Sequence, residues 1–299
     1  MTNGYAGPVL RWYAAHARDL PWRLPGASAW SVLVSEIMLQ QTPVARVLPA
    51  HAAWLARWPT PQSLAAAAPG DAVRQWGRLG YPRRALWLHA TATILTDDHG
   101  GQVPASVQTL RGLPGVGSYT AAAVASFAFG QRHAVLDTNA RRVLARLVRG
   151  EQMPPRSASA AEVKLAEALL PAAPSRAARW SVAVMELGAL VCRAARPECA
   201  SCPVARQCAW RRAGSPAGPR RPASQPYVGS DRECRGRMLA VLRAAAEPVP
   251  AARLEAAWPD RAQQARALSA LVADGLAAAL DHQTYALPGG TPGARTGVA

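Results

Sequence analysis

At 299 residues the chain is too long for one small core, and its length predicts two or three compact units. Lysine and arginine number 34 against 18 acidic residues, which gives a net charge of +16 at pH 7 and favours a polyanionic partner such as nucleic acid. The sequence has neither an apolar signal core near its start nor a run of transmembrane length, so we expect a cytoplasmic protein with no membrane partner.

Apolar residues at helical spacing predict an all-α chain up to Arg212. The expected helices cover residues 9–16, 30–41, 46–58, 70–79, 83–96, 120–129, 139–148, 159–170 and 176–191. Residues 213–230 hold four prolines, three glycines, Arg220, Arg221 and no acid, which predicts a basic linker. Beyond it, helical patterns over 235–246, 251–258 and 261–276 precede a hairpin pattern over 277–287. The unit at 231–299 is therefore expected to be a winged helix or a plain helical domain.

Four of the five cysteines crowd into seventeen residues with the spacing C-x6-C-x2-C-x5-C; they are Cys192, Cys199, Cys202 and Cys208. In a cytoplasmic chain such crowding favours metal ligation over disulfides. Four thiolates can satisfy a tetrahedral zinc ion or the four irons of a [4Fe-4S] cube, and the spacing alone does not separate the two. Cys234 lies beyond the linker and is interpreted as a structural thiol.

The segment Leu113-Pro-Gly-Val-Gly117 joins a helical turn over 106–110 to a helix that starts at Ser118. Gly115 and Gly117 permit a tight turn and a close backbone approach. Their amides, with the following helix N-terminus, form a natural phosphate site. The segment has the signature of a helix-hairpin-helix, although an ordinary turn between two helices can have the same composition.

Glu36 and Asp137 are candidate catalytic groups. Apolar residues three and four positions away surround Glu36 on its helix, so burial should raise its pKa and let it donate a proton. A partly exposed glutamate paired with arginine is the alternative. Asp137 directly precedes a helix, where aspartate is most often an N-cap, yet an ionised Asp137 could stabilise a sugar cation. Cleavage of a glycosidic bond uses two carboxyl groups of opposite protonation.

Six motifs stand in order along the chain: L-P-W-R at 20–23, S-E-I-M-L-Q-Q-T at 35–42, L-G-Y-P-R-R at 79–84, L-P-G-V-G-S-Y-T-A at 113–121, L-D-T-N at 136–139 and M-E-L-G-A at 185–189. From about residue 10 to 212 the chain thus resembles the MutY-type adenine DNA glycosylases of the endonuclease III superfamily. The resemblance implies a mostly α, two-lobed helix-hairpin-helix glycosylase fold for 1–212, with a six-helix lobe over about 24–136. Residues 1–23 with 137–212 would form the other lobe, whose cysteines resemble the family's [4Fe-4S] loop.

The resemblance also assigns roles to single residues. It implies that Glu36 protonates adenine, that Asp137 stabilises the sugar cation, and that Asn139 and Tyr119 orient the reacting groups. The residues expected to line the adenine pocket are Trp22, Arg23 and Glu186. Those expected to contact DNA are Gln40, Gln41, Tyr81, Gly115 and Gly117, with Gln41 and Tyr81 wedging into the base stack.

Tyr119 stands where lyase-type relatives have lysine, so we expect a monofunctional enzyme. It would hydrolyse the N-glycosidic bond of adenine mispaired with 8-oxoguanine or guanine in double-stranded DNA, as a monomer in the nucleoid. The alternatives are a mismatch thymine or oxidised-pyrimidine glycosylase of the same superfamily, and a non-enzymatic iron–sulfur DNA-binding regulator.

Two features depart from the family pattern. Pro82 replaces the second aromatic residue of the family's G-Y-Y motif, and residues 213–299 are too short and too helical for the Nudix-like domain with which the family usually ends. The C-terminal unit is instead expected to add phosphate contacts. Truncation after Arg212 would then weaken duplex binding and flatten its salt dependence.

Overall fold

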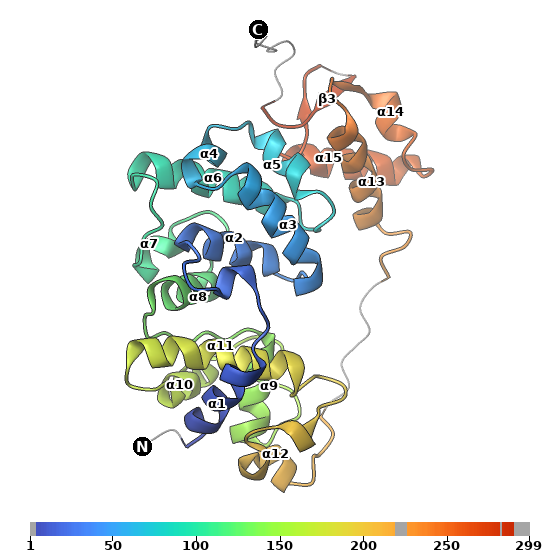
Figure 1. Cartoon of the computed structure of the whole chain (residues 1–299). Coiled ribbons are helices and arrows are strands. Elements are labelled where there is room, and N and C mark those ends of the chain that lie inside the picture. The colour runs from blue at the N-terminus through green and yellow to red at the C-terminus, as the bar shows by residue number, and fades with distance from the viewer. Residues whose placement is uncertain (1–3, 219–225, 282, 290–299) are drawn as a thin grey trace. The chain divides into compact units, whose positions relative to one another are not determined.

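The computed structural model describes residues 4–218, 226–281 and 283–289, and helices dominate these ranges (Figure 1). The mostly α fold is therefore confirmed. No helix within these ranges is both long and apolar enough to cross a membrane. The chain forms two compact units, and it passes from one to the other inside helix α2, shortly before α7 and on either side of the turn that precedes α8. The lobe boundaries expected from the sequence, at 23/24 and 136/137, remain predictions. Arg220 and Arg221 of the linker lie outside the described residues.

The first unit comprises residues 1–36, 104–112 and 116–221. Its helices are α1 (Ala6–His16), η1 (Pro21–Arg23), most of α2 (Ala29–Leu39), α7 (Val107–Arg111), α8 (Ser118–Phe129), α9 (Thr138–Leu144), η2 (Ala145–Arg149), α10 (Ala160–Leu169), α11 (Pro174–Leu190), η3 (Cys199–Ser201), η4 (Ala205–Gln207) and α12 (Ala209–Arg212). Its core is formed where α1 and α9 pack on α11, around the fully buried Val9, Ala183 and Leu187. The apolar faces of these three helices account for that packing.

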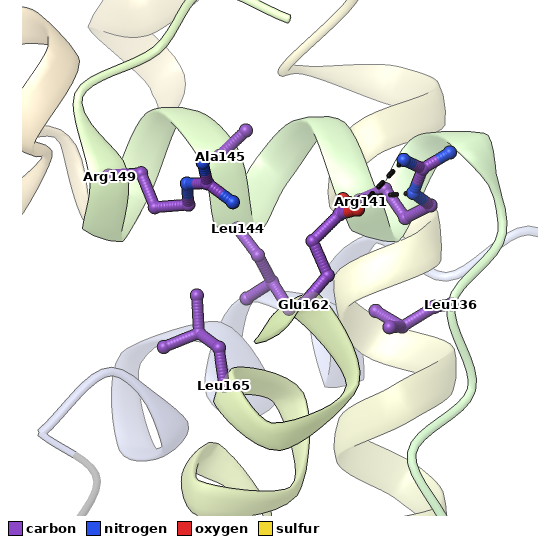
Figure 2. Close-up of a pocket in the computed structure, with 7 residues that line it drawn as sticks. All are labelled: Leu136, Arg141, Leu144, Ala145, Arg149, Glu162 and Leu165. Atoms are coloured by element: carbon purple, nitrogen blue, oxygen red, sulfur yellow. Dashed lines mark hydrogen bonds and ion pairs between the residues drawn. The ribbon is translucent and has the colours of Figure 1, made fainter. Parts of the chain in front are cut away.

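A buried ion pair fastens the first turn of α10 to helix α9 (Figure 2). Arg141 donates from Nε and Nη2 to the two carboxylate oxygens of Glu162, each at 3.0 Å, and Nη2 also donates to the carbonyls of Pro155 and Ser157 at 2.9 Å. Glu162 in turn completes a capping box with Ser159 at the start of α10. This pair is structural, and it serves below as a control.

The second unit comprises residues 37–103, 113–115 and 222–299. Its elements are α3 (Val44–Arg57), α4 (Pro61–Ala65), α5 (Pro69–Trp76), α6 (Arg83–Asp98), α13 (Asp231–Ala244), β1 (Val249–Pro250), α14 (Ala251–Glu255), α15 (Arg261–Ala273), β2 (Ala278–Ala279) and β3 (Thr284–Ala286). Trp54 and Trp76 are fully buried and meet edge to face, with ring centroids 5.7 Å apart. Helix α4 was not expected, because a five-residue helix opened by a capping box is too short to show helical periodicity.

The C-terminal part of this unit has the order helix, strand, helix, helix, strand, strand, with its sheet in the antiparallel order β1-β3-β2. The three helices and the hairpin expected beyond the linker are therefore present, together with the short strand β1. Strand β1 is two residues long and leaves no alternating pattern in the sequence.

Helices α13 and α15 dock on α5 and α6 through backbone contacts and one shared carboxylate. Arg74 donates to the carbonyls of Arg243 and Ala245, and Arg243 donates back to the carbonyl of Val73 at 2.9 Å. Asp274 pairs with Arg83 of α6 and with Arg235 of α13. At Gly70 a Cβ would lie 2.6 Å from the Pro288 oxygen, so only glycine permits this approach.

Candidate active site

Glu36 is buried in the first unit, on a helix whose other residues are almost all apolar. Burial raises the pKa of Glu36 to about 7, a hydrogen bond from Tyr119 and the charge of Arg23 oppose that rise, and the charge of Asp137 adds to it. The burial and raised pKa expected from its apolar neighbours are therefore confirmed. A carboxyl group with this pKa holds its proton in a large fraction of molecules at neutral pH and is suited to act as an acid.

Tyr119 is the second residue of α8 and donates its phenolic proton to Glu36. Burial raises the pKa of Tyr119 well above its ordinary value of 10, and the neighbouring carboxyl groups of Glu36 and Asp137 raise it further. The hydroxyl therefore stays protonated. The chain's single lysine, Lys164, lies exposed on α10, so no amine occupies the position of Tyr119.

Asp137 is the N-cap of α9, as its sequence context suggested. Its Oδ1 accepts from the backbone N–H of Ala140 at 2.6 Å, and its Oδ2 accepts from Asn139 Nδ2 at 2.8 Å. Burial raises the pKa of Asp137, while these donors and the charge of Arg142 oppose that rise. Because both oxygens accept hydrogen bonds from N–H groups, the geometry favours the ionised carboxylate.

Asn139 is oriented by a donor on its other side. Arg142 Nη2 donates to Asn139 Oδ1 at 2.7 Å, which leaves the amide NH2 facing Asp137. Arg142 also donates to the carbonyl of Gly188 at 2.7 Å and to that of Cys192 at 2.8 Å. A Cβ at Gly188 would stand 2.7 Å from Asn139 Cβ, so the glycine of the M-E-L-G motif admits Asn139.

Glu186 is fully buried on α11 and is held by two arginines. Arg18 grips both carboxylate oxygens with Nε at 2.7 Å and Nη2 at 2.9 Å, and Arg23 donates to Oε2 at 2.6 Å. Burial alone would raise the pKa of Glu186, but the bonds and charges of the two arginines lower it to about 2. Trp22, buried beside Arg23 on η1, belongs to the same region.

The expected chemical residues of the first unit therefore meet in one place. Tyr119 links Glu36 to the surroundings of Asp137, and Arg23 links Glu36 to Glu186. Gly117 caps α8 with extended backbone, and a Cβ there would meet nothing within 4 Å, so its own chain does not demand glycine. An approaching external backbone is a use for that open space.

The other expected DNA contacts lie in the second unit. Tyr81 OH donates to Gln41 Oε1 at 2.8 Å, and Gln40 Nε2 donates to the carbonyl of Gly115 at 3.2 Å. Gly115 has φ +73°, and a Cβ there would press on Trp87 at 3.0 Å. Glycine is therefore required at this turn.

Comparison with known proteins places this geometry in a family. The profile of HhH-GPD superfamily base excision DNA repair proteins matches residues 34–168. The adenine DNA glycosylase of Mycobacterium tuberculosis (strain ATCC 25618 / H37Rv) is 52% identical over 288 residues, covering 94% of this chain and 92% of that protein. The chain belongs to the adenine DNA glycosylase family. The resemblance inferred from the six motifs is thus confirmed.

Two further relatives each match 70% of this chain. The human adenine DNA glycosylase is 41% identical over 217 residues, covering 70% of this chain and 40% of the human protein. The solved structure of a thermostable thymine-DNA glycosylase has a TM-score of 0.62 and 26% identity, covering 70% of this chain and 95% of that one. The expected helix-hairpin-helix glycosylase fold is therefore confirmed, and the mycobacterial match covers almost the whole chain.

The four clustered cysteines of this family member gather at one edge of the first unit's core. Burial raises the pKa of Cys202 to about 11, and the other three cysteines are close enough to raise it further. Arg146 Nη1 donates to Cys192 Sγ at 3.4 Å, and the Cys208 thiol donates to the Arg146 carbonyl. In the described ranges, no three metal-ligating side chains already stand at ion-binding distances. Four sulfur donors on one loop still fit a group that takes four thiolates.

Sequence reasoning missed two arginines of the site, Arg18 and Arg142. Arg18 and Glu186 are 168 residues apart, and the Arg142 contact with Cys192 spans 50 residues. No periodic pattern reports contacts at such separations. The available signal was weaker: Arg142 is one of two adjacent arginines within the last five residues of a short helix, all five of which are buried.

Proposed function

We propose that the chain is a monofunctional adenine DNA glycosylase that hydrolyses the N-glycosidic bond of adenine paired with 8-oxoguanine or guanine. The observation that carries the proposal is the joining of Glu36, Tyr119 and Asp137 in one unit, with Glu36 suited to give up a proton. A regulator that only binds DNA has no use for two carboxyl groups in such contrasting surroundings.

In this mechanism Glu36 delivers its proton to a ring nitrogen of the flipped adenine, which turns the base into a neutral leaving group. The ionised Asp137 stabilises the cationic sugar that remains, and Asn139 keeps the Asp137 carboxylate turned toward that sugar. Water then attacks the sugar carbon, with Glu36 accepting a proton. The ion pair of Arg23 with Glu186, next to Trp22, offers a polar wall for the adenine edge.

The direct experiment incubates the full chain with duplexes that carry A opposite 8-oxoguanine, A opposite G, or T opposite G. We expect adenine release and an abasic product that breaks only after alkali treatment, because no lysine amine is present at the site. Release of thymine but not adenine would identify a mismatch thymine glycosylase. Tight binding without release from any duplex would favour the regulator.

We further propose that Cys192, Cys199, Cys202 and Cys208 hold a [4Fe-4S] cluster. When bound, the cluster supplies a structural cross-link of its loop rather than a reactive group. Exposed arginines crowd this loop and the short helix after it, at Arg193, Arg196, Arg206, Arg211 and Arg212, and would face DNA phosphates. The protein would act on chromosomal DNA as a monomer, in the cytoplasm and at the nucleoid.

Purified protein is expected to be brown and to contain about four irons per chain. Cys202→Ser should lose most of the iron, since one of four thiolate ligands is gone. Cys234→Ser is the matched control, because this buried thiol lies on α13 against the Met238 sulfur, outside the four-cysteine loop, and should leave the iron unchanged. Stoichiometric zinc in protein purified without oxygen would contradict the assignment.

For the domains we propose residues 1–212 as the glycosylase core, 213–230 as a basic linker and 231–299 as a winged-helix domain. The charges of the winged-helix domain argue against the phosphate-binding role expected for it from the sequence. Residues 231–288 contain seven arginines and seven acids, and several of the arginines are paired within the unit. The Arg243 side chain donates to the Val73 carbonyl of α5 and so takes part in the docking contact. We infer that the domain braces α5 and α6.

Salt titration separates the two tasks. Arg253→Gln with Arg261→Gln, two exposed sites on α14 and α15, should leave the slope of log affinity against log salt nearly unchanged. The matched double variant Arg211→Gln with Arg212→Gln should flatten the slope by up to about 1.8, since each lost phosphate contact removes about 0.9. Equal flattening in both variants would restore the phosphate-binding role of the C-terminal domain.

A further inference from the structure

Gln41 and Tyr81 are exposed residues of the second unit whose backbones adopt left-handed conformations. Their φ angles are +56° and +48°, and Ser215 is the other non-glycine residue with positive φ in the part of the chain that the structure describes. Side chains with a Cβ avoid this region because the Cβ crowds the neighbouring carbonyl oxygen. Strain kept at an exposed position points to a function for the side chain displayed there.

The two strained residues form one projecting pair. Tyr81 OH donates to Gln41 Oε1 at 2.8 Å, and Tyr81 is still 53% exposed. The pair joins two loops that are 40 residues apart in sequence, one after α2 and one before α6. A flat ring with an amide beside it, held at a surface, is suited to stack on bases.

Arg84 lies under this pair and is almost fully buried, at 2% exposure. Its Nη1 and Nη2 donate at 2.6–3.0 Å to the carbonyls of Ile37, Met38, Gln40 and Gly80 and to the Thr42 hydroxyl. The guanidinium also lies 5.3 Å from the centroid of the Tyr81 ring. Burial lowers the pKa of Arg84 to about 10, because it disfavours the charged form of the guanidinium.

These contacts bracket both strained positions. Gln40 and Thr42 flank Gln41, and Gly80 directly precedes Tyr81. A guanidinium carries five donors fixed in one plane, so a single side chain can set the two loops relative to each other. A lysine has one nitrogen and cannot reach both loops in this way.

We propose that Arg84 is a positioning residue that holds Gln41 and Tyr81 as a preformed wedge for the base stack. The proposal rests on the proposed glycosylase function and deepens it. A wedge already in its inserting conformation reduces the ordering cost of opening the duplex. The competing explanation is that Arg84 only satisfies the last carbonyls of α2, which would make its role purely one of stability.

The test compares two substrates and one binding signal in the full chain. Arg84→Lys is expected to slow single-turnover excision of a mispaired adenine at least tenfold, yet to slow excision from an unpaired, bulged adenine less than about threefold. In a Glu36→Gln background, fluorescence of a 2-aminopurine placed beside the mispair should rise on binding, and Arg84→Lys should abolish most of that rise. The fluorescence arm needs no excision, so failure of the proposed function and failure of the wedge are distinguishable.

Arg141→Lys is the matched control, because Arg141 is another buried arginine that donates to several loop carbonyls, and it lies far along the chain from the wedge. Figure 2 shows Arg141 with its ion-pair partner Glu162. It should lose stability while keeping the duplex-to-bulge ratio and the fluorescence rise. If Arg84→Lys behaves in the same way, the proposal is overturned. If Arg84→Lys does not fold, Thr42→Val decides, since it deletes one acceptor of Arg84 at constant shape. We expect a ratio shift of about threefold, and an unchanged ratio overturns the proposal.

Discussion

Glu36→Gln is expected to abolish base release while leaving the affinity for mispaired duplex nearly unchanged. The glutamine has the same shape but carries no transferable proton, and acid catalysis of this kind contributes roughly 10²–10⁴-fold. Glu36 is buried and does not face phosphates, so binding should survive. Single-turnover excision and a filter-binding titration on the same duplex measure the two quantities.

The pKa of Glu36 adds a pH dependence with a defined sign. Its ordinary value is 4.5 and burial raises it to about 7, so the proton needed for catalysis is lost above pH 7. The wild-type rate should therefore fall above about pH 7. Between the two values the folded protein binds a proton that the unfolded chain has released, so this group makes stability fall as pH rises from 4.5 to 7. Glu36→Gln removes that penalty and should be more stable than wild type at pH 8, by at most about 3 kcal/mol.

Glu162→Gln is the matched control, because Glu162 is a buried glutamate of the same unit that takes part in an ion pair. Glu162 is paired with Arg141 (Figure 2). Burial alone would raise the pKa of Glu162, but hydrogen bonds from Arg141 and Ser159 keep that pKa below the ordinary value. Its replacement should lower stability and preserve excision, the reverse of Glu36→Gln. Near wild-type excision by Glu36→Gln would refute the assigned mechanism.

The helices that the sequence predicts are those whose apolar residues recur with the helical period. Helix α2 is apolar and buried almost all round, since Val32, Leu33, Ile37 and Met38 are nearly or fully buried and leave Glu36 as a carboxyl group among them. The same local pattern explains why the candidate acid could be identified without a structure. Two short elements, α4 and β1, carry too few positions for any period and were missed.

What the sequence could not supply is the set of contacts between distant segments. The bidentate grip of Arg18 on Glu186 and the position of Arg84 under two loops depend on tertiary packing alone. The left-handed backbones at Gln41 and Tyr81 also leave no signal in the sequence, because neither residue type favours that conformation. Asp137 is intermediate: its N-cap position is local and was foreseen. The bond that orients its other oxygen needs Asn139 to be held by Arg142, which is itself held by the distant carbonyls of Gly188 and Cys192.

Asp137 is both the N-cap of α9 and the group proposed to stabilise the sugar cation, so Asp137→Asn is the second variant with a large expected effect. Asparagine is as good an N-cap as aspartate, so its side-chain oxygen can still accept from the N–H of Ala140 and α9 should form. It carries no charge, however, and cannot stabilise a sugar cation. We expect excision to fall by at least about 10³-fold, with thermal stability close to wild type and duplex binding retained.

Asp137→Ala separates capping from catalysis, because alanine removes the cap as well as the charge. It should match Asp137→Asn in lost excision but also lose roughly 1 kcal/mol of stability. Asn139→Ala tests the orienting bond: Asp137 keeps its charge and its cap, but Oδ2 loses its 2.8 Å donor, so excision should fall by an intermediate factor. If Asp137→Asn instead excises adenine at near the wild-type rate while Asp137→Ala fails through instability alone, Asp137 serves only to begin α9. The cation would then have to be stabilised by another group, for which the ionised Glu186, with its pKa of about 2, is the next carboxylate of this unit to replace.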